Sequence, residues 1–185
     1  MASPNFSQRP TCTPQKKYVE SAGTVLFYLA TREICVLHHL RHDQYILPKG
    51  RRNLGESLAT TATRETTEET GIPCRLLPVD LVSRLCPAAE TFDVSDEPRL
   101  FKGVCEPIAL QTRRVGKGEI KVVWWFVVVW WFVVVVNEDE AGGRHEDGYD
   151  VEFYSYDAVL ERLTFTDDRE VVKKAIELNS SSYGN

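Results

Sequence analysis

Short apolar runs alternate with polar, turn-forming residues through the first third of the chain. The runs 21–29 and 33–40 flank Ala30-Thr31-Arg32, and this spacing predicts a β-hairpin. A third short strand is expected at Tyr45-Ile46-Leu47, ending at Pro48-Lys49-Gly50. Later strands are expected in the apolar segments 74–86, from 120 onward and at 151–154.

Helical segments are expected at 56–70, 157–163 and 167–178. The first is followed by Gly71, where a C-cap glycine is expected, and by Pro73, which ends the helix. The intervening segment 87–119 is long, polar and interrupted by Pro and Gly. A connection of that length in a compact domain is expected to be functional or disordered. These elements alone predict a mixed α and β fold.

The segment Val122–Val136 is apolar throughout, and its first six residues, VVWWFV, are repeated at once as Val128–Val133. It is too short for a membrane span, which needs about 20 residues. As one strand it would run about 50 Å at roughly 3.3 Å per residue, longer than a domain of this size accommodates. We interpret it as a six-residue duplication in a core strand, whose second copy bulges, loops out or lengthens a hairpin. An even insertion keeps the flanking side chains on their faces.

Composition is typical of a soluble protein whose 185 residues suffice for one domain with a sizeable core. The net charge of −5 argues against nucleic-acid binding, which usually requires a basic face. Five cysteines without metal or redox spacing indicate free thiols in a reducing compartment, so we expect the cytoplasm and leave the nucleus open. Residues 1–18 lack an apolar leader and are expected to form a disordered tail; 19–179 form the domain and 180–185 a loose tail.

Three carboxylates gather within the helix expected at 56–70. Glu65, Glu68 and Glu69 are spaced i, i+3 and i+4, so they are neighbours on one side of the helix. Like charges at this spacing repel by a few tenths of a kcal/mol per pair. A solvated helix face tolerates that repulsion, and a bound Mg²⁺ relieves it, because carboxylates are its preferred protein ligands.

These residues belong to a longer pattern: Gly50, five residues, Glu56, seven residues, Arg64-Glu65, two residues, Glu68-Glu69, one residue, Gly71-Ile72. The pattern resembles the Nudix box, the defining motif of the Nudix hydrolases. The resemblance implies an α/β/α sandwich with a mixed sheet, an α+β fold. It also implies hydrolysis of a phosphoanhydride with Mg²⁺ or Mn²⁺. One position departs from the pattern, since Thr66 stands where a large apolar residue is usual.

The resemblance also implies roles for the box residues. Glu65 and Glu69 are the expected metal ligands, and Glu68 is a further ligand or the general base. Gly50 would offer its backbone carbonyl to a metal, and Arg64 would orient a ligating carboxylate. Glu56 is either an accessory metal ligand or orienting group, or simply a helix N-terminal charge. The pattern leaves open which carboxylate takes the proton.

Substrate choice depends on residues outside the box. Lys49, Arg51 and Arg52 place three cations beside the expected metal site, and Leu47-Pro48-Lys49-Gly50 resembles enzymes acting on dinucleoside polyphosphates and diphosphoinositol polyphosphates. Further cations would either extend this into a basic rim around the site or simply keep a flexible loop soluble. They are Arg41, Arg113, Arg114, Lys117 and Lys121. Aromatic platforms for a base are Tyr45, Phe92 and Trp124.

The leading hypothesis is therefore a metal-dependent pyrophosphohydrolase for such polyphosphates. ADP-ribose or a nucleotide sugar is the alternative, faintly supported by Pro87, which stands near the position that marks ADP-ribose hydrolases. A module that binds nucleotides or polyphosphates without turnover is the third. No membrane partner is expected, and the sequence does not predict an oligomeric state.

Overall fold

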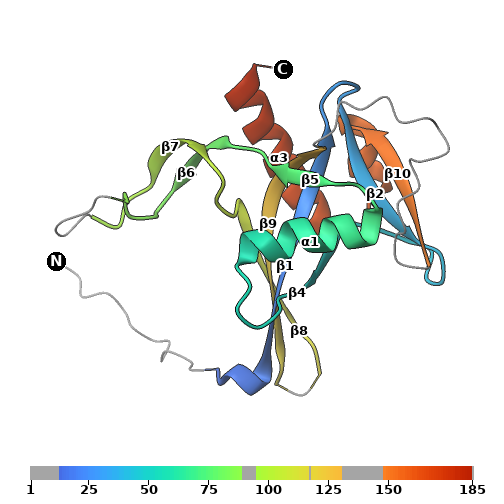
Figure 1. The fold of residues 1–185 in the computed structure, drawn as a ribbon, viewed down its shortest axis with the longest axis horizontal. Helices are drawn as coiled ribbons and strands as arrows, with labels where there is room; N and C mark the ends of the chain where they lie inside the picture. The colour runs from blue at the N-terminus through green and yellow to red at the C-terminus, as the bar shows by residue number, and fades with distance from the viewer. Residues whose placement is uncertain (1–12, 89–94, 117, 131–147, 185) are drawn as a thin grey trace, which may run out of the picture.

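The computed structural model describes residues 13–88, 95–116, 118–130 and 148–184. At its centre β1 (Tyr18–Tyr28) runs parallel to β9 (Ile120–Trp130), and antiparallel strands extend the sheet on both sides (Figure 1). β2 (Glu33–His39) forms a hairpin with β1, as predicted. The remaining members of the sheet are β3 (Gln44–Ile46), β4 (Lys49–Arg51), β5 (Cys74–Leu76), β8 (Ala109–Arg114) and β10 (Tyr149–Ser155).

Two strands stand apart from this sheet. β6 (Val79–Ser83) and β7 (Arg99–Val104) pair with each other and project from the body of the molecule (Figure 1). The prediction of one long connection over residues 87–119 is therefore wrong for β7 and β8, which are strands within it. Exposed and half-buried positions alternate along both strands, but Leu100 and Leu110 are exposed whereas Arg99 and Gln111 are half-buried. The sequence therefore lacks the alternation of apolar and polar residues that predicts a strand.

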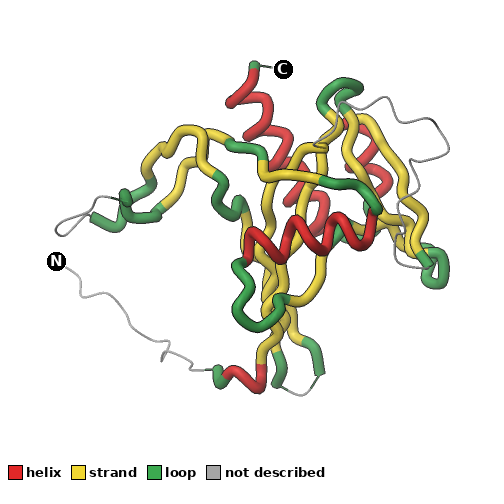
Figure 2. The backbone as a smooth tube through the Cα atoms, viewed as in Figure 1, coloured by secondary structure: helices red, strands yellow, loops and turns green. Residues whose placement is uncertain are grey.

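Helices cover both faces of the large sheet, which confirms the α/β/α sandwich (Figure 2). On one face, α1 (Leu58–Thr70) packs Ala62 against Ala22 and Phe126. On the other, α2 (Tyr156–Arg162) and α3 (Thr166–Tyr183) pack against alternate residues of β1 and β9, including Trp125. Because strand side chains alternate between faces, one strand supplies both cores.

The box helix α1 begins and ends with the expected caps. The Ser57 hydroxyl accepts a hydrogen bond from the Thr60 N–H, and Gly71 adopts φ +70 at the C-cap. The unusual Thr66 is fully buried against β1. Its hydroxyl donates to the Ala62 carbonyl (2.7 Å) and accepts from the Thr24 hydroxyl (2.7 Å). A second buried threonine therefore satisfies the polar group at this position.

Both predicted tails include residues that belong to regular elements of the structure. The first 12 residues lie outside the described part, but Gln15–Lys17 form a 3₁₀ turn and Tyr18 already pairs with Ile120 in the sheet. At the other end α3 continues to Tyr183, where Tyr183 donates to the Pro78 carbonyl and Ser182 accepts from the Asp80 N–H. The prediction of a loose tail from residue 180 is therefore wrong, because these side chains anchor the last turn.

The duplicated segment forms one long strand as far as it is described. β9 contains the whole first copy and continues through Val128, Val129 and Trp130 of the second. Val128 and Val129 pair with β1 and with β5, so the second copy extends the strand at this point without a bulge. Its last three residues, and most of the loop predicted at 141–150, lie outside the described residues.

In the described part of the chain no helix is long and apolar enough to cross a membrane. Among the described residues, the thiols of Cys35, Cys74 and Cys105 form no disulfide.

Candidate functional site

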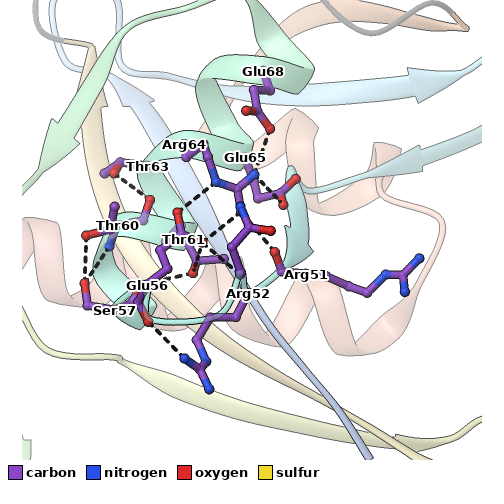
Figure 3. A network of polar contacts seen from close by, with 12 residues as sticks. Arg51, Arg52, Glu56, Ser57, Thr60, Thr61, Thr63, Arg64, Glu65 and Glu68 are labelled. Atoms are coloured by element: carbon purple, nitrogen blue, oxygen red, sulfur yellow. Dashed lines mark hydrogen bonds and ion pairs between the residues drawn. The ribbon is translucent and has the colours of Figure 1, made fainter.

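Arg64, on α1, is the centre of the box (Figure 3). Its guanidinium donates to Glu56, Glu65 and Glu68, with all three carboxylates at 2.8 Å from their nearest nitrogen. Nη2 also donates to the Arg51 carbonyl at 3.0 Å, which ties the helix to β4. This planar fork matches carboxylate geometry in a way that Lys cannot. The positive charge of Arg64 therefore offsets the electrostatic repulsion among the carboxylates of Glu56, Glu65 and Glu68.

Glu56 is the most fully bonded of these carboxylates. It accepts from Arg64 Nε and Nη2, from the Asn53 N–H at 3.0 Å and from the Thr61 hydroxyl at 2.9 Å. The hydrogen bond from Arg64 is the largest of the effects that lower the Glu56 pKa to about 2. Four hydrogen-bond donors therefore hold the two oxygens of Glu56 in place.

Glu65 lies directly over Gly50. A Cβ built on Gly50 would stand 1.8 Å from Glu65 Oε2, far inside van der Waals contact. Arg64 Nη1 donates to the other oxygen, Oε1. Glycine at position 50 therefore lets the Glu65 carboxylate lie against the β4 backbone, and Arg64 fixes it there.

Glu69 and Glu68 differ in exposure. The buried Glu69 is only 7% exposed, and its Oε2 accepts the Lys49 backbone N–H at 2.8 Å. The Glu68 side chain is 57% exposed, and Arg64 is bonded to its Oε2. Glu69 is thus bonded to the β4 backbone and Glu65 lies against it at Gly50, whereas Glu68 faces solvent.

Four cations lie near β4 on the far side of the sheet from α1. Arg113 of β8 stands directly opposite Lys121 of β9, and Lys49 and Arg51 lie beyond the small residues of β1. In Figure 3 the Arg51 side chain points away from the carboxylates. Burial is the largest of the effects that lower the Lys121 pKa, followed by repulsion from Lys49 and Arg113.

The predicted cations Arg52 and Arg41 differ from these four. The Arg52 side chain is held by hydrogen bonds within the protein: its Nε donates to Glu20 at 2.6 Å and its Nη1 donates to the Glu56 carbonyl at 3.0 Å. Arg41 is exposed in the turn between β2 and β3. The structure therefore brings Lys49 and Arg51 of the predicted set together with Arg113 and Lys121.

Comparison with known proteins decides the family. A NUDIX domain model matches residues 17–175, which covers most of the chain. The chain belongs to the Nudix family. It is 25% identical over 180 residues to an 8-oxo-(d)GTP phosphatase of Mycolicibacterium smegmatis, a match that covers 91% of this chain and 45% of the relative. The chain thus spans less than half the length of that curated relative.

Solved structures share the Nudix fold. A Caenorhabditis elegans Ap4A hydrolase in a binary complex superposes with a TM-score of 0.58 at 19% identity, covering 88% of this chain and 98% of that one. A MutT protein from Methanosarcina mazei Go1 superposes with a TM-score of 0.54 at 17% identity, covering 90% and 99%. At these identities the likeness establishes the fold alone.

Nudix hydrolases generally use divalent metals, and the donor type at this site fits one. Glu65, Glu68 and Glu69 offer the hard oxygen ligands that Mg²⁺ prefers, and the Glu65 carboxylate lies against the backbone of Gly50. Among the described residues, however, no three His, Cys, Asp or Glu side chains are gathered closely enough to hold a metal. Glu68 is the exposed member of the set, and its side chain is 57% exposed.

A cavity of about 340 Å³ beside Lys49 supplies residues that the sequence did not point to. It is lined by β3, β4, β8 and the first turn of α3, including Gln44, Gln111 and the buried Asp168. These side chains come from segments far apart in the chain, so no local spacing could have predicted them. Of the predicted aromatic platforms, Tyr45 is already stacked between His38 and Arg162, and Phe92 lies outside the described residues.

Proposed function

We propose that this Nudix protein hydrolyses a phosphoanhydride in a dinucleoside polyphosphate or a diphosphoinositol polyphosphate, using Mg²⁺ or Mn²⁺. The observation that carries the proposal is the pairing of two charge groups across β4. Carboxylates organised by Arg64 lie on one side, and Lys49, Arg51, Arg113 and Lys121 lie on the other. Such a pairing suits a substrate whose phosphates extend beyond the bond that is cut.

Glu65 and Glu69 are the proposed metal ligands, with the Gly50 carbonyl. A bound divalent ion supplies charge neutralisation at the phosphates and acidifies a water molecule. Arg64 holds Glu65 and Glu68 in place, and Glu56 holds Arg64. The Lys49 N–H fixes Glu69. The carboxylates therefore reach the reaction already oriented, which lowers the entropic part of the barrier.

In the proposed reaction, water adds to one phosphorus of the P–O–P bridge. The bond from that phosphorus to the bridging oxygen breaks, and the leaving phosphate takes the electron pair. Glu68 is the proposed base for the proton that water releases. It is the most exposed of the box carboxylates, with only Oε2 bonded to Arg64, whereas the low pKa of Glu56 makes that group a poor proton acceptor.

A nucleoside triphosphate is the second candidate substrate. It is favoured by the relative named 8-oxo-(d)GTP phosphatase, at 25% identity. ADP-ribose has less support, because Pro87, the residue that suggested it, is exposed beyond β6 and does not line the cavity beside Lys49.

The test is phosphate release under Mg²⁺ from diadenosine tetraphosphate, diphosphoinositol pentakisphosphate, GTP and ADP-ribose. We expect kcat/KM to be highest for a molecule with four or more phosphates. A clear preference for ADP-ribose would overturn the polyphosphate assignment. Turnover of none of the four would instead indicate a binding module without catalysis.

A further inference from the structure

The loop that carries Glu56, residues 52–56, leads from β4 towards α1 without burying a side chain. Arg52 and Glu56 are half-buried, and the three residues between them are exposed. Leu54, the apolar residue of the loop, is fully exposed, and Gly55 has open space around it at φ +79. A segment with so little apolar burial opens easily unless polar contacts hold it. The position of Glu56 therefore depends on hydrogen bonds and ion pairs.

Arg52 supplies such contacts to two different segments. Its backbone N–H donates to the Glu20 carbonyl of β1 at 3.0 Å, and its Nε donates to Glu20 Oε2 at 2.6 Å. These bonds continue the β1–β4 pairing one residue beyond Arg51. Nη1 donates to the Glu56 carbonyl at 3.0 Å, at the other end of the loop (Figure 3). One guanidinium thus joins β1 to both ends of the loop.

The environment of this ion pair strengthens it. The Arg52 and Glu20 side chains are 30% and 26% exposed, so solvent screens their attraction less than it screens a fully exposed pair. Arg52 also uses different nitrogens for its two partners. The ammonium group of a lysine has a single nitrogen, which cannot reach in the two directions at once. The bridge therefore depends on the shape of arginine as well as on its charge.

The position of the loop determines how Arg64 is held. The Glu56 carboxylate accepts from Arg64 Nε at 2.8 Å and from Nη2 at 3.0 Å. The remaining nitrogen, Nη1, donates to Glu65 and Glu68. Arg52 bonds the carbonyl of Glu56 and leaves its carboxylate to Arg64. A shift of the loop would therefore rotate the guanidinium of Arg64 and, with it, the carboxylates of the box.

We propose that Glu20 and Arg52 are positioning residues for the reaction: their ion pair fixes the loop 52–56, so that Glu56 keeps Arg64 aligned with the box carboxylates. This gives Arg52 a role different from the phosphate contact that the sequence predicted. The inference rests on the proposed function, because its effect on rate comes from the orientation of those carboxylates.

The kinetic test uses Mg²⁺ and whichever of diadenosine tetraphosphate, diphosphoinositol pentakisphosphate, GTP and ADP-ribose wild type hydrolyses fastest. Arg52→Gln should lower kcat by about tenfold and change KM by less than about twofold. Arg52→Lys keeps the charge without the bridge, so it should lower kcat by at least about fivefold. Glu20→Gln should lower kcat by about threefold, since Arg52 retains its bond to the Glu56 carbonyl. Combined with Arg52→Gln, it should cause no further loss.

Arg84→Gln is the matched control. It removes another arginine from an ion pair, the one with Asp96 beside β6 and β7, and should leave kcat unchanged. A raised KM with unchanged kcat in Arg52→Gln would show a phosphate contact and overturn the proposal. Arg52→Lys with the kcat of wild type would overturn it as well, because charge alone would then suffice.

A second measurement needs neither metal nor turnover. In EDTA, ¹⁵N NMR follows solvent exchange of the Arg64 Nε–H, which wild type protects through its 2.8 Å bond to Glu56. Exchange should be about tenfold faster in Arg52→Gln and unchanged in Arg84→Gln. Equal exchange in Arg52→Gln and wild type would overturn the proposal. Faster exchange in a protein that hydrolyses none of the four compounds would support the positioning of Arg64 while refuting the proposed catalytic function.

Discussion

Replacing Gly50 by alanine isolates the contact between β4 and the box helix. The new Cβ would stand 1.8 Å from Glu65 Oε2, 1.9 Å from Cδ and 2.3 Å from Oε1, whereas an ordinary contact is 3.4–4 Å. The carboxylate must therefore move by about 1.5 Å, which breaks its 2.8 Å hydrogen bond with Arg64. A displacement of about 1 Å in a catalytic group can cost about 10²-fold in rate. We expect Gly50→Ala to lower kcat/KM by at least that factor.

Stability should change little in this variant, because Glu65 can move toward solvent. Gly103→Ala is the matched control, with the opposite signature. Gly103 has φ +60 and nothing within 4 Å of an added Cβ, so alanine there is strained by roughly 1–2 kcal/mol but far from chemistry. It should lower the free energy of unfolding and leave kcat/KM unchanged.

A steady-state assay on diadenosine tetraphosphate and urea unfolding measure the two quantities. Gly50→Ala combined with Glu65→Gln should be no worse than Glu65→Gln alone, because both remove the same placed carboxylate. Activity of Gly50→Ala within threefold of wild type, beside an inactive Glu65→Gln, would refute the reasoning that Gly50 positions Glu65.

Three further predictions concern stability and the duplicated strand. The Glu56 pKa is lowered from 4.5 to about 2, so its carboxylate stabilises the fold above about pH 4.5 and loses that effect as pH falls toward 2. The unfolding free energies of wild type and Glu56→Gln should therefore converge between pH 4.5 and pH 2. A difference in unfolding free energy that does not depend on pH would contradict the pairing of Glu56 with Arg64. Thr66→Val should lower the free energy of unfolding by about 1–3 kcal/mol, because it leaves the buried Thr24 hydroxyl without its acceptor, and adding Thr24→Val should recover most of that loss. Urea unfolding in which the effects of the two substitutions simply add would count against this. Deleting Val128–Val133 moves Val134–Val136 into the places of Val128–Trp130 in β9, so fold and activity should survive, and a soluble but inactive deletion variant would show that the duplication is functional.

Local patterns predicted the fold well where one segment determines its own structure. The β1–β2 hairpin, α1 with its Gly71 cap, and the two C-terminal helices follow from apolar spacing and from capping residues. β7 and β8 were missed because they lie half-exposed, so their side chains carry little apolar signal. The extent of β9 depends on its pairing with β1 and β5, which no local pattern encodes.

In the candidate site too, local spacing predicted some of the residue contacts, and others depend on tertiary folding. Helical spacing alone placed Glu65, Glu68 and Glu69 together. That Arg64 would bond three carboxylates at once depends on the loop carrying Glu56 folding back onto α1. Asp168 and Gln111 lie beside Lys49 only because of the tertiary fold. Arg52 could not be distinguished from Arg51 in the sequence, but in the structure it donates a hydrogen bond to Glu20.

The most direct test of the catalytic account is kcat for Glu69→Gln on diadenosine tetraphosphate under Mg²⁺. Glutamine keeps an oxygen to accept the Lys49 N–H, so the fold should persist, while the charge that stabilises the transition state is lost. We expect kcat to fall by at least about 10²-fold with the unfolding free energy nearly unchanged. A folded Glu69→Gln variant with kcat close to wild type would contradict the assignment of this carboxylate to the reaction.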